Sequence, residues 1–460
     1  MDTLRFEGEK IFSAHGIQGT PGLYPLTDGM IFKIGSSAAR LIFHKKGIRK
    51  DLKIIIARDS TFSLERIELI LADAISFYGI DVALSGIIPI GGLSMLIRDK
   101  GFDLGIMISS SSLSPQDNGI RFFSDNGMRL SKEDEDWMEQ LILGSLINYP
   151  RQEEIPEKGS LSRLNDSASV YIDFLAKTVS GTQLKGLKIA LDCRGYEPAR
   201  FASRLFEKLG IGVTVLADTK RVSGIDENAR ADFSVLSGLV KRDKKDAGFA
   251  FDHDGDRLTA VCENGRVLDG DDIMALFGLY LLQRGRLSKN TLVTTVASNS
   301  GLKEVIERHS GKVIYTKVGY NYVASKIYDK GLNFGGEKCG HILFTDYLPV
   351  SDGLLTAVQI LAVMKETNKP LSKLTECIKK RPQVECSVAI DFKRPFSRHI
   401  KLKNAISKWA NKIKSHGRLL VRYSETDKLL RIVAESDSEP LARETADSLK
   451  SIFISEFSAG

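Results

Sequence analysis

Three aspartates at alternating positions give the sharpest chemical signal in the sequence. Asp252, Asp254 and Asp256 directly follow an apolar stretch, in the run AGFAFDHDGDR. Alternate residues of an extended segment point the same way, so the three carboxylates can converge on one point. Anions held that close repel one another strongly unless a cation lies among them. Carboxylate oxygens select a hard ion, and Mg²⁺ leaves positions open for water or a phosphate oxygen. The pattern therefore indicates a Mg²⁺ site.

Two other interpretations of this acidic run are open. The three aspartates and Glu263 occupy positions one, three, five and twelve of an EF-hand loop. However, Arg257 stands where that loop needs its turn glycine, and an apolar strand pattern rather than a helix precedes it. The second alternative is a solvated acidic turn without a ligand. The other motifs must decide between them.

A second stretch, ISSSSLSPQDNGIRFF, contains the four consecutive serines Ser109 to Ser112. Ser, Asn, Asp, Gly and Pro gather in loops for conformational reasons alone, and this composition by itself favours a polar loop. The alternative is that one of the serines is a nucleophile.

Short apolar runs separated by helical patterns must position these groups. Consecutive apolar residues, many of them β-branched, are typical of strands buried on both faces of a mostly parallel sheet. Between two of these runs, the spacing of Leu64, Ile67, Leu71 and Ile75 predicts a helix over 63–79. This repeated βαβ pattern places ligand loops where strands end. The apolar runs are 53–57, 104–108, 187–191, 247–251 and 291–296.

The length of 460 residues suggests three or four domains, at about 100–200 residues each. A polar stretch at 148–167 is predicted to be a linker, and a further break is expected near 365–374. After that break the pattern becomes strand, helix, strand, strand, helix, which is typical of a smaller α+β unit.

Composition excludes several classes of function. The sequence is 42% hydrophobic and 27% charged with a formal net charge of +7, which is ordinary for a globular protein. It has no arginine-rich block or zinc-finger spacing, so nucleic acid is not an expected partner. Its 5 cysteines form no CxxC pair, and the N-terminus has no apolar signal region. The longest uncharged run, Val82 to Ile97, is shorter than the roughly 20 residues of a membrane span. We expect a cytoplasmic protein that does not bind a membrane.

Four loops make the chain similar to the α-D-phosphohexomutase superfamily over essentially its whole length. In chain order they are FSAHGIQG, which is similar to FGTDGIRG; FDHDGDR, similar to the metal loop DGDGDR; GGEKCGH, similar to the sugar-recognition loop GExSGH; and RYSETDKLLR, similar to the phosphate-anchoring loop RxSGTEPxxR. The serine stretch is similar to SASHNPxxDNGIKFF, and its flank is nearest to the branch that acts on glucosamine phosphate.

The resemblance implies three similar α/β domains with mixed, mostly parallel sheets and a C-terminal α+β domain, arranged around a central cleft. The implied domains are a phosphoserine-loop domain, a metal-loop domain, a sugar-recognition domain and a phosphate-binding domain, at 1–155, 156–256, 257–370 and 371–460.

The implied activity moves phosphate between the 6- and 1-hydroxyls of a hexose phosphate, through a phosphoserine and a hexose bisphosphate. Glucosamine phosphate is the preferred substrate, glucose or mannose phosphate follow, and the protein is expected to be a monomer or homodimer. Aligned through DNGI, the carrier is Ser111, which also contacts the Mg²⁺ held by the three aspartates, and Arg121 lies in the catalytic site. The implied substrate-binding residues are Arg257, Glu337, Cys339, His341, Arg422, Ser424, Thr426 and Arg431.

Departures from the family pattern concentrate around the serine. Arg121 replaces a lysine usually assigned to proton transfer, and arginine keeps its proton at any relevant pH. His253 replaces a glycine between metal ligands, as either a new proton-transfer group or an exposed loop histidine. The alternative function is therefore a catalytically impaired paralogue that binds sugar phosphates or another protein. The other changed positions are His15, Gln18, Thr61, Ser112, Leu113, Ser114, Tyr320, Asn321 and Glu425.

Overall fold

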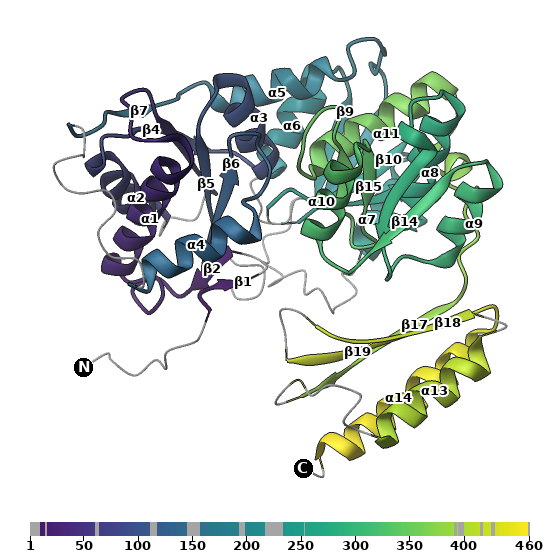
Figure 1. Ribbon diagram of the computed structural model, residues 1–460. Helices are drawn as coiled ribbons and strands as arrows, with labels where there is room; N and C mark the ends of the chain where they lie inside the picture. The colour runs from purple at the N-terminus through teal and green to yellow at the C-terminus, as the bar shows by residue number, and fades with distance from the viewer. Residues whose placement is uncertain are drawn as a thin grey trace. The chain divides into compact units, whose positions relative to one another are not determined.

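The chain is an α/β protein whose strands form several separate sheets (Figure 1). The computed structural model describes residues 10–13, 16–59, 64–110, 117–144, 157–192, 198–216, 233–252, 254–390, 393, 400–414, 417–424 and 428–458. Two compact units can be separated, one of residues 1–270 and 339–374 and the other of residues 271–338 and 375–460.

The first sheet of the first unit is mixed, in the order β1-β2-β6-β5-β3-β4-β7. Strands β3, β4, β5 and β7 pair in parallel, whereas β6 runs antiparallel to both β5 and β2. The strands are β1 (Phe12–Ser13), β2 (Gly16–Gly19), β3 (Lys53–Arg58), β4 (Asp81–Ile87), β5 (Leu104–Ser110), β6 (Asn118–Ser124) and β7 (Leu161–Arg163).

Helices bury both faces of this sheet, as the apolar runs predicted. On one face, a core of strand residues such as Ile54 and Ile106 packs with residues of α1, α2 and α4. On the other face, Gly105 of β5 lies directly under Ile97 of α3, where any larger side chain would collide. These helices are α1 (Asp28–Lys46), α2 (Leu64–Phe77), α3 (Ile90–Lys100) and α4 (Lys132–Ile142).

The second sheet of this unit has the order β12-β11-β10-β8-β9. Its strands β8, β9 and β10 are parallel, and β10 continues into the antiparallel strands β11 and β12. The strands are β8 (Lys188–Asp192), β9 (Gly212–Leu216), β10 (Ala247–Phe251), β11 (Leu258–Cys262) and β12 (Val267–Leu268). The remaining elements of the unit are α5 (Ser167–Lys177), α6 (Pro198–Lys208), α7 (Ser234–Arg242), β16 (Ile342–Phe344), α11 (Gly353–Thr367) and α12 (Leu371–Leu374).

The second unit contains a parallel arrangement in which β13 lies between β14 and β15. It also contains an antiparallel sheet in the order β17-β19-β18, and helices α13 and α14 cover one face of that sheet (Figure 1). Its elements are α8 (Gly270–Gln283), a 3₁₀ turn (Ser288–Asn290), β13 (Thr291–Thr295), α9 (Ser300–Arg308), β14 (Lys312–Thr316), α10 (Tyr320–Lys330), β15 (Phe334–Gly336), β17 (Gln383–Ala389), α13 (Ile400–Ile413), β18 (Gly417–Tyr423), β19 (Leu429–Ser436) and α14 (Glu439–Ser458).

Each of the five apolar runs forms a strand, and the C-terminal order of strand, helix, strand, strand, helix is confirmed. The linker expected at 148–167 is wrong in its second half, because β7 pairs there with β4 and α5 begins at Ser167. The first sheet thus extends beyond residue 155, and the second sheet extends beyond residue 256. The four domain boundaries stay a proposal.

No helix within the described ranges combines the length and the apolar character needed to cross a bilayer. The long uncharged run at 82–97 forms strand β4 and the first part of helix α3.

A buried hydrogen bond joins α5 to the start of α11. Asp352 caps α11 by accepting from the Leu355 N–H at 2.9 Å, and its other oxygen accepts from the Tyr171 hydroxyl at 2.6 Å. Gly91 of α3 packs against the same carboxylate so closely that a Cβ would lie 1.8 Å from Asp352 Oδ2. Burial raises the pKa of Asp352 to about 6, although the hydrogen bonds from Tyr171 and the helix backbone oppose the rise.

We expect Tyr171→Phe to destabilise the protein more at about pH 8 than at about pH 5. A carboxyl whose pKa is higher in the folded than in the unfolded chain costs stability as the pH rises between the two values. Losing the Tyr171 hydroxyl raises the folded pKa further and removes a hydrogen bond to a charged group, worth about 2 kcal/mol. Urea unfolding at both pH values measures the difference.

The control is Tyr328→Phe, because the Tyr328 side chain is 68% exposed. This variant should behave like the parent protein at both pH values. If Tyr171→Phe lost the same stability at both pH values, the assignment of ionised Asp352 as the acceptor of the Tyr171 hydrogen bond would be contradicted.

Candidate functional site

The acidic run forms the turn of a hairpin between β10 and β11. Phe251, at the end of β10, pairs with Leu258, at the start of β11, and the aspartates lie between them. The Asp252 side chain folds the turn back by accepting from the Arg257 N–H at 3.1 Å. Gly255 has φ of 70° at the sharpest point, a conformation that glycine adopts without strain. The hairpin therefore presents its carboxylates from a short, closed turn.

Two neighbouring segments hold this turn in place. The N–H of Gly353, in the first turn of α11, donates to the Gly255 carbonyl at 2.9 Å. The N–H of Leu258 donates to the Gly340 carbonyl at 3.1 Å. Gly340 has φ of 102°, and a Cβ there would lie 2.5 Å from the Leu258 carbonyl oxygen. Only glycine permits this close approach, which brings the following His341 beside the turn.

Each aspartate faces a cationic group. The Arg121 guanidinium, from β6, pairs with Asp254 at 2.5 Å, and these side chains are only 7% and 9% exposed. The Arg257 Nε atom lies 3.5 Å from Asp252 Oδ2. The His341 ring lies 3.4 Å from Asp256 Oδ1. The carboxylates are thus neutralised one by one from different parts of the first unit.

The pKa values of the turn follow from burial and this pairing. Burial, with the charges of Asp256 and Asp254, raises the pKa of Asp252 well above its usual value. Burial also acts to raise the pKa of Asp256, but His341, Arg257 and Arg121 outweigh it and hold that pKa low. Burial acts to lower the pKa of Arg121, and the three carboxylates raise it further than burial lowers it. Burial therefore makes the ionised form of Asp252 unfavourable, even though each aspartate has a cationic partner.

His341 has two alternative contacts at its Nε2 atom. Arg257 Nε donates to this atom at 3.1 Å, which requires a neutral ring with no proton there. The contact with Asp256 requires instead that Nε2 carries a proton and donates it. Burial acts to lower the pKa of His341, but Cys339 and Asp256 raise it well above its usual value. The protonated ring paired with Asp256 is accordingly the favoured form, and Arg257 then faces Asp252.

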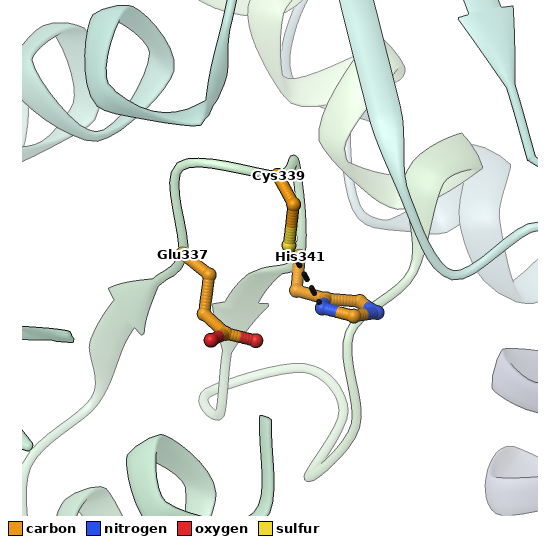
Figure 2. Close-up of side chains that lie close together, drawn as sticks. All are labelled: Glu337, Cys339 and His341. Atoms are coloured by element: carbon orange, nitrogen blue, oxygen red, sulfur yellow. Dashed lines mark hydrogen bonds between the residues drawn. The ribbon is translucent and has the colours of Figure 1, made fainter. Parts of the chain in front are cut away.

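The sugar-recognition residues predicted from the sequence lie on one five-residue stretch, which Figure 2 shows. The Sγ atom of Cys339 lies 3.4 Å from Nδ1 of His341, along the dashed line in the figure. One carboxylate oxygen of Glu337, Sγ of Cys339 and a ring nitrogen of His341 all lie within 4.8 Å of one another. Glu337 is fixed by the Gly319 N–H, which donates to Oε1 at 2.9 Å.

The two predicted phosphate-anchoring arginines face each other across a strand pair. Arg422 of β18 is directly opposite Arg431 of β19 in the antiparallel register. Like charges at directly opposed positions repel, so an anion bound between them would relieve the repulsion. Ser424 follows on the same strand end and is buried, with its N–H donating to the Leu429 carbonyl.

The structure thus brings Arg121, Asp252, Asp254, Asp256, Arg257, Cys339 and His341 together in the first unit. Arg422, Ser424 and Arg431 gather on the C-terminal sheet. Ser111, Thr426 and His253 lie outside the described residues. Sequence reasoning missed Asp352 and Gly353, which support the turn through backbone packing and the helix cap. The only available signal was the SDG run before an apolar helix, which is typical of a helix start.

The side chains of the turn fit a hard divalent cation. Three carboxylates on one short turn supply oxygen donors, which Mg²⁺ prefers. Burial, together with the charges of Asp256 and Asp254, keeps the pKa of Asp252 high although Arg257 opposes the rise, so its ionised form carries an electrostatic penalty. A cation among the three aspartates would remove that penalty.

The fold and the carboxylate cluster are those of an α/β enzyme that transfers phosphoryl groups. Residues 9–145 match the family model "Phosphoglucomutase/phosphomannomutase, alpha/beta/alpha domain I". Residues 269–381 match the corresponding model of domain III. The chain belongs to the phosphoglucomutase/phosphomannomutase family, and it is an intramolecular phosphotransferase.

Named relatives agree with this family. A phosphoglucosamine mutase of Lactobacillus johnsonii is 35% identical over 434 residues, which cover 94% of this chain and 96% of that protein. Among solved structures, a phosphoglucomutase/phosphomannomutase family protein from Burkholderia thailandensis has a TM-score of 0.78 at 21% identity, covering 97% of each chain. An Aspergillus fumigatus N-acetylphosphoglucosamine mutase, solved with GlcNAc-6P and magnesium, has a TM-score of 0.62 at 14% identity, covering 96% of this chain and 94% of that one.

We expect Arg121→Gln to lower the stability of the metal-free protein strongly. Removing one partner of a buried ion pair leaves a buried charge uncompensated, which costs about 3 kcal/mol or more. If Mg²⁺ binds the aspartates, adding it should recover part of this loss. Thermal unfolding in chelator and in Mg²⁺ measures both effects.

Arg66→Gln is the matched control, because Arg66 and Asp28 form an ion pair with side chains 74% and 53% exposed. Exposed pairs contribute little to stability because solvent screens them, so this variant should change little in either condition. Equal behaviour of the two variants would contradict the role of Arg121 at the carboxylate turn.

Proposed function

We propose that the chain is a phosphohexomutase that interconverts glucosamine 6-phosphate and glucosamine 1-phosphate, through a phosphoserine at Ser111 and a hexose bisphosphate. The observation that carries this proposal is the closed turn of three aspartates beside Arg121 and His341, in a member of this family. The choice of sugar is supported by the curated relatives named phosphoglucosamine mutase, at 35% and 36% identity.

The serine run supports Ser111 as the phosphate carrier. Ser109 belongs to β5 and is fully buried, so its hydroxyl cannot meet a substrate. Strand β5 ends at Ser110, and Ser111 is the first residue beyond it. Ligand loops of open α/β sheets lie beyond the carboxyl ends of parallel strands. On the neighbouring β6, Arg121 reaches the acidic turn from the same sheet.

Asp252, Asp254 and Asp256 would hold Mg²⁺, which the donor chemistry favours. When bound, the ion supplies positive charge that stabilises a phosphoryl group during transfer. The magnesium in the Aspergillus fumigatus structure belongs to that protein, and it is consistent with this proposal.

The transfer is a balanced exchange between two oxygens. The P–O bond to Ser111 breaks as a P–O bond forms to the free hydroxyl of the sugar monophosphate, and the hydroxyl proton ends on the serine. The reverse exchange then takes the original phosphate from the bisphosphate back to Ser111. Arg121 stabilises charge during these steps and cannot accept the proton, because its guanidinium stays protonated.

The remaining residues would orient the sugar phosphate. Glu337 and His341 would hydrogen-bond to sugar hydroxyls, with Cys339 beside them. Arg422 and Arg431 would clamp the phosphate that is not transferred, because guanidinium matches its bidentate edge. Hydroxyls of Ser424 and Thr426 would complete this anchor.

One observation favours the alternative of an impaired paralogue that still binds sugar phosphates. Arg121 stands where the family has a proton-transferring lysine, and it is occupied by its ion pair with Asp254. The activity test below distinguishes the two functions.

We expect peptide mass spectrometry of the purified protein to find phosphate on Ser111. Ser111→Ala should abolish conversion of glucosamine 6-phosphate in a coupled assay with Mg²⁺ and a hexose 1,6-bisphosphate, because no carrier remains. The same assay across glucosamine, N-acetylglucosamine, glucose and mannose phosphates identifies the sugar.

Ser112→Ala serves as the neighbouring control and should keep the phosphate on Ser111. Failure to convert any of these hexose phosphates, in protein that binds Mg²⁺, would refute the mutase and leave the binding function. Phosphate on a different serine would refute only the assignment of the carrier.

We expect Arg431→Gln to weaken hexose phosphate binding about tenfold or more, because a charge-assisted hydrogen bond to phosphate is lost. Without ligand, the same change should leave thermal stability equal or slightly higher, since it removes the repulsion between Arg422 and Arg431. Calorimetric titration and thermal unfolding measure the two effects. The exposed Lys428→Gln is the control, and unchanged affinity in Arg431→Gln would contradict the phosphate anchor.

A further inference from the structure

The stretch from Glu337 to His341 carries three different kinds of metal ligand. It offers a carboxylate, a thiol and an imidazole, whereas the acidic turn offers carboxylates alone. Thiolate and imidazole ligands select zinc over magnesium. The loop that this stretch resembles has serine at the position of Cys339, so the thiol distinguishes this chain from that pattern.

The spacing of the donor atoms suits tetrahedral zinc. With Zn–S of about 2.3 Å and Zn–N of about 2.0 Å, tetrahedral geometry separates the two ligand atoms by about 3.5 Å. The Sγ atom of Cys339 and Nδ1 of His341 are 3.4 Å apart. An oxygen of Glu337 is within 4.8 Å of Sγ of Cys339 and of a ring nitrogen of His341, and Figure 2 shows the three side chains gathered at one loop. All three positions lie within five consecutive residues, so the local backbone sets this geometry.

The surroundings orient these ligands as in a zinc site. Metal-bound histidines usually donate their other ring N–H to a carboxylate, which fixes the ring. Here Nε2 of His341 faces Asp256 Oδ1 at 3.4 Å. Glu337 is held through its bond from the Gly319 N–H. Cys339 is exposed, so an ion from solvent can reach the thiol.

The Arg257 guanidinium contacts the imidazole of this cluster. Its Nε contact at 3.1 Å is with Nε2 of His341, on the opposite side of the ring from Nδ1. With a metal on Nδ1, Nε2 carries the proton and donates to Asp256. Arg257 then retains its ion pair with Asp252.

We propose that Glu337, Cys339 and His341 bind Zn²⁺ through one carboxylate oxygen, Sγ and Nδ1, and leave a fourth position for water. Binding forms bonds from zinc to Sγ, to Nδ1 and to the carboxylate oxygen, and it releases two protons to solvent, one from the Cys339 thiol and one from Nδ1 of the protonated His341 ring. Insofar as the proposed function holds, bound Zn²⁺ inhibits the mutase, because it occupies the carboxylate and imidazole that would hold the sugar hydroxyls.

Cobalt spectroscopy of the reduced full-length protein tests this site independently of activity. Co²⁺ is added in the presence of excess Mg²⁺, and a thiolate-to-cobalt charge-transfer band should appear in the near ultraviolet and disappear when Zn²⁺ replaces Co²⁺. Cys339→Ser should lose the band and about a hundredfold in Zn²⁺ affinity. Cys377→Ser is the matched control, because the half-buried Cys377 thiol lies outside the cluster. This variant should keep both the charge-transfer band and the Zn²⁺ affinity of the parent protein.

Absence of the band in the parent protein, or its persistence in Cys339→Ser, would overturn the zinc site. Circular dichroism of both variants checks that they are folded. A second arm measures hexose phosphate conversion with and without Zn²⁺, and expects inhibition that chelator reverses. If the band appears in a protein that converts no hexose phosphate, the proposed function fails while the zinc site stands. Conversion that is insensitive to bound Zn²⁺ would overturn the inhibitory role.

Discussion

The site depends on one electrostatic constraint, which is the confinement of three carboxylates on the short turn between β10 and β11. The turn is closed by its own backbone, by Gly353 of α11 and by the Gly340 carbonyl, so the aspartates cannot move apart. Burial and the neighbouring negative charges of Asp256 and Asp254 together raise the pKa of Asp252. Arg121, Arg257 and His341 offset it, and each comes from a different segment.

The confined carboxylates explain why an arginine can be buried at position 121. An arginine that is nearly fully buried would be unfavourable without an anion, and Asp254 provides one at 2.5 Å. The same permanent charge that suits this ion pair excludes proton transfer. Arg121 therefore compensates the charge of Asp254, and this ion pair stabilises the turn when no metal is bound.

The regular elements could be predicted well from the sequence, because local patterns determine them. The buried apolar runs became β3, β5, β8, β10 and β13 without exception. Strand β7 was missed because its three residues are exposed and polar or charged in part, and only its pairing with β4 makes it a strand. The sequence also could not predict the division into two units or the extent of each sheet, because both depend on pairing between strands far apart in the chain.

The sequence alone determined which residue types occur at short spacing: the alternating aspartates, the Glu-Cys-His stretch and the two arginines of the C-terminal run RYSETDKLLR. Such patterns can be recognised in the sequence because residues that are close along the chain lie on one backbone segment and are therefore close in space. Only the tertiary structure decided that Arg121 meets Asp254, and that Tyr171 meets Asp352 across a separation of 181 positions. These pairs arise from the packing of helices and sheets, and residue spacing carries no information about it.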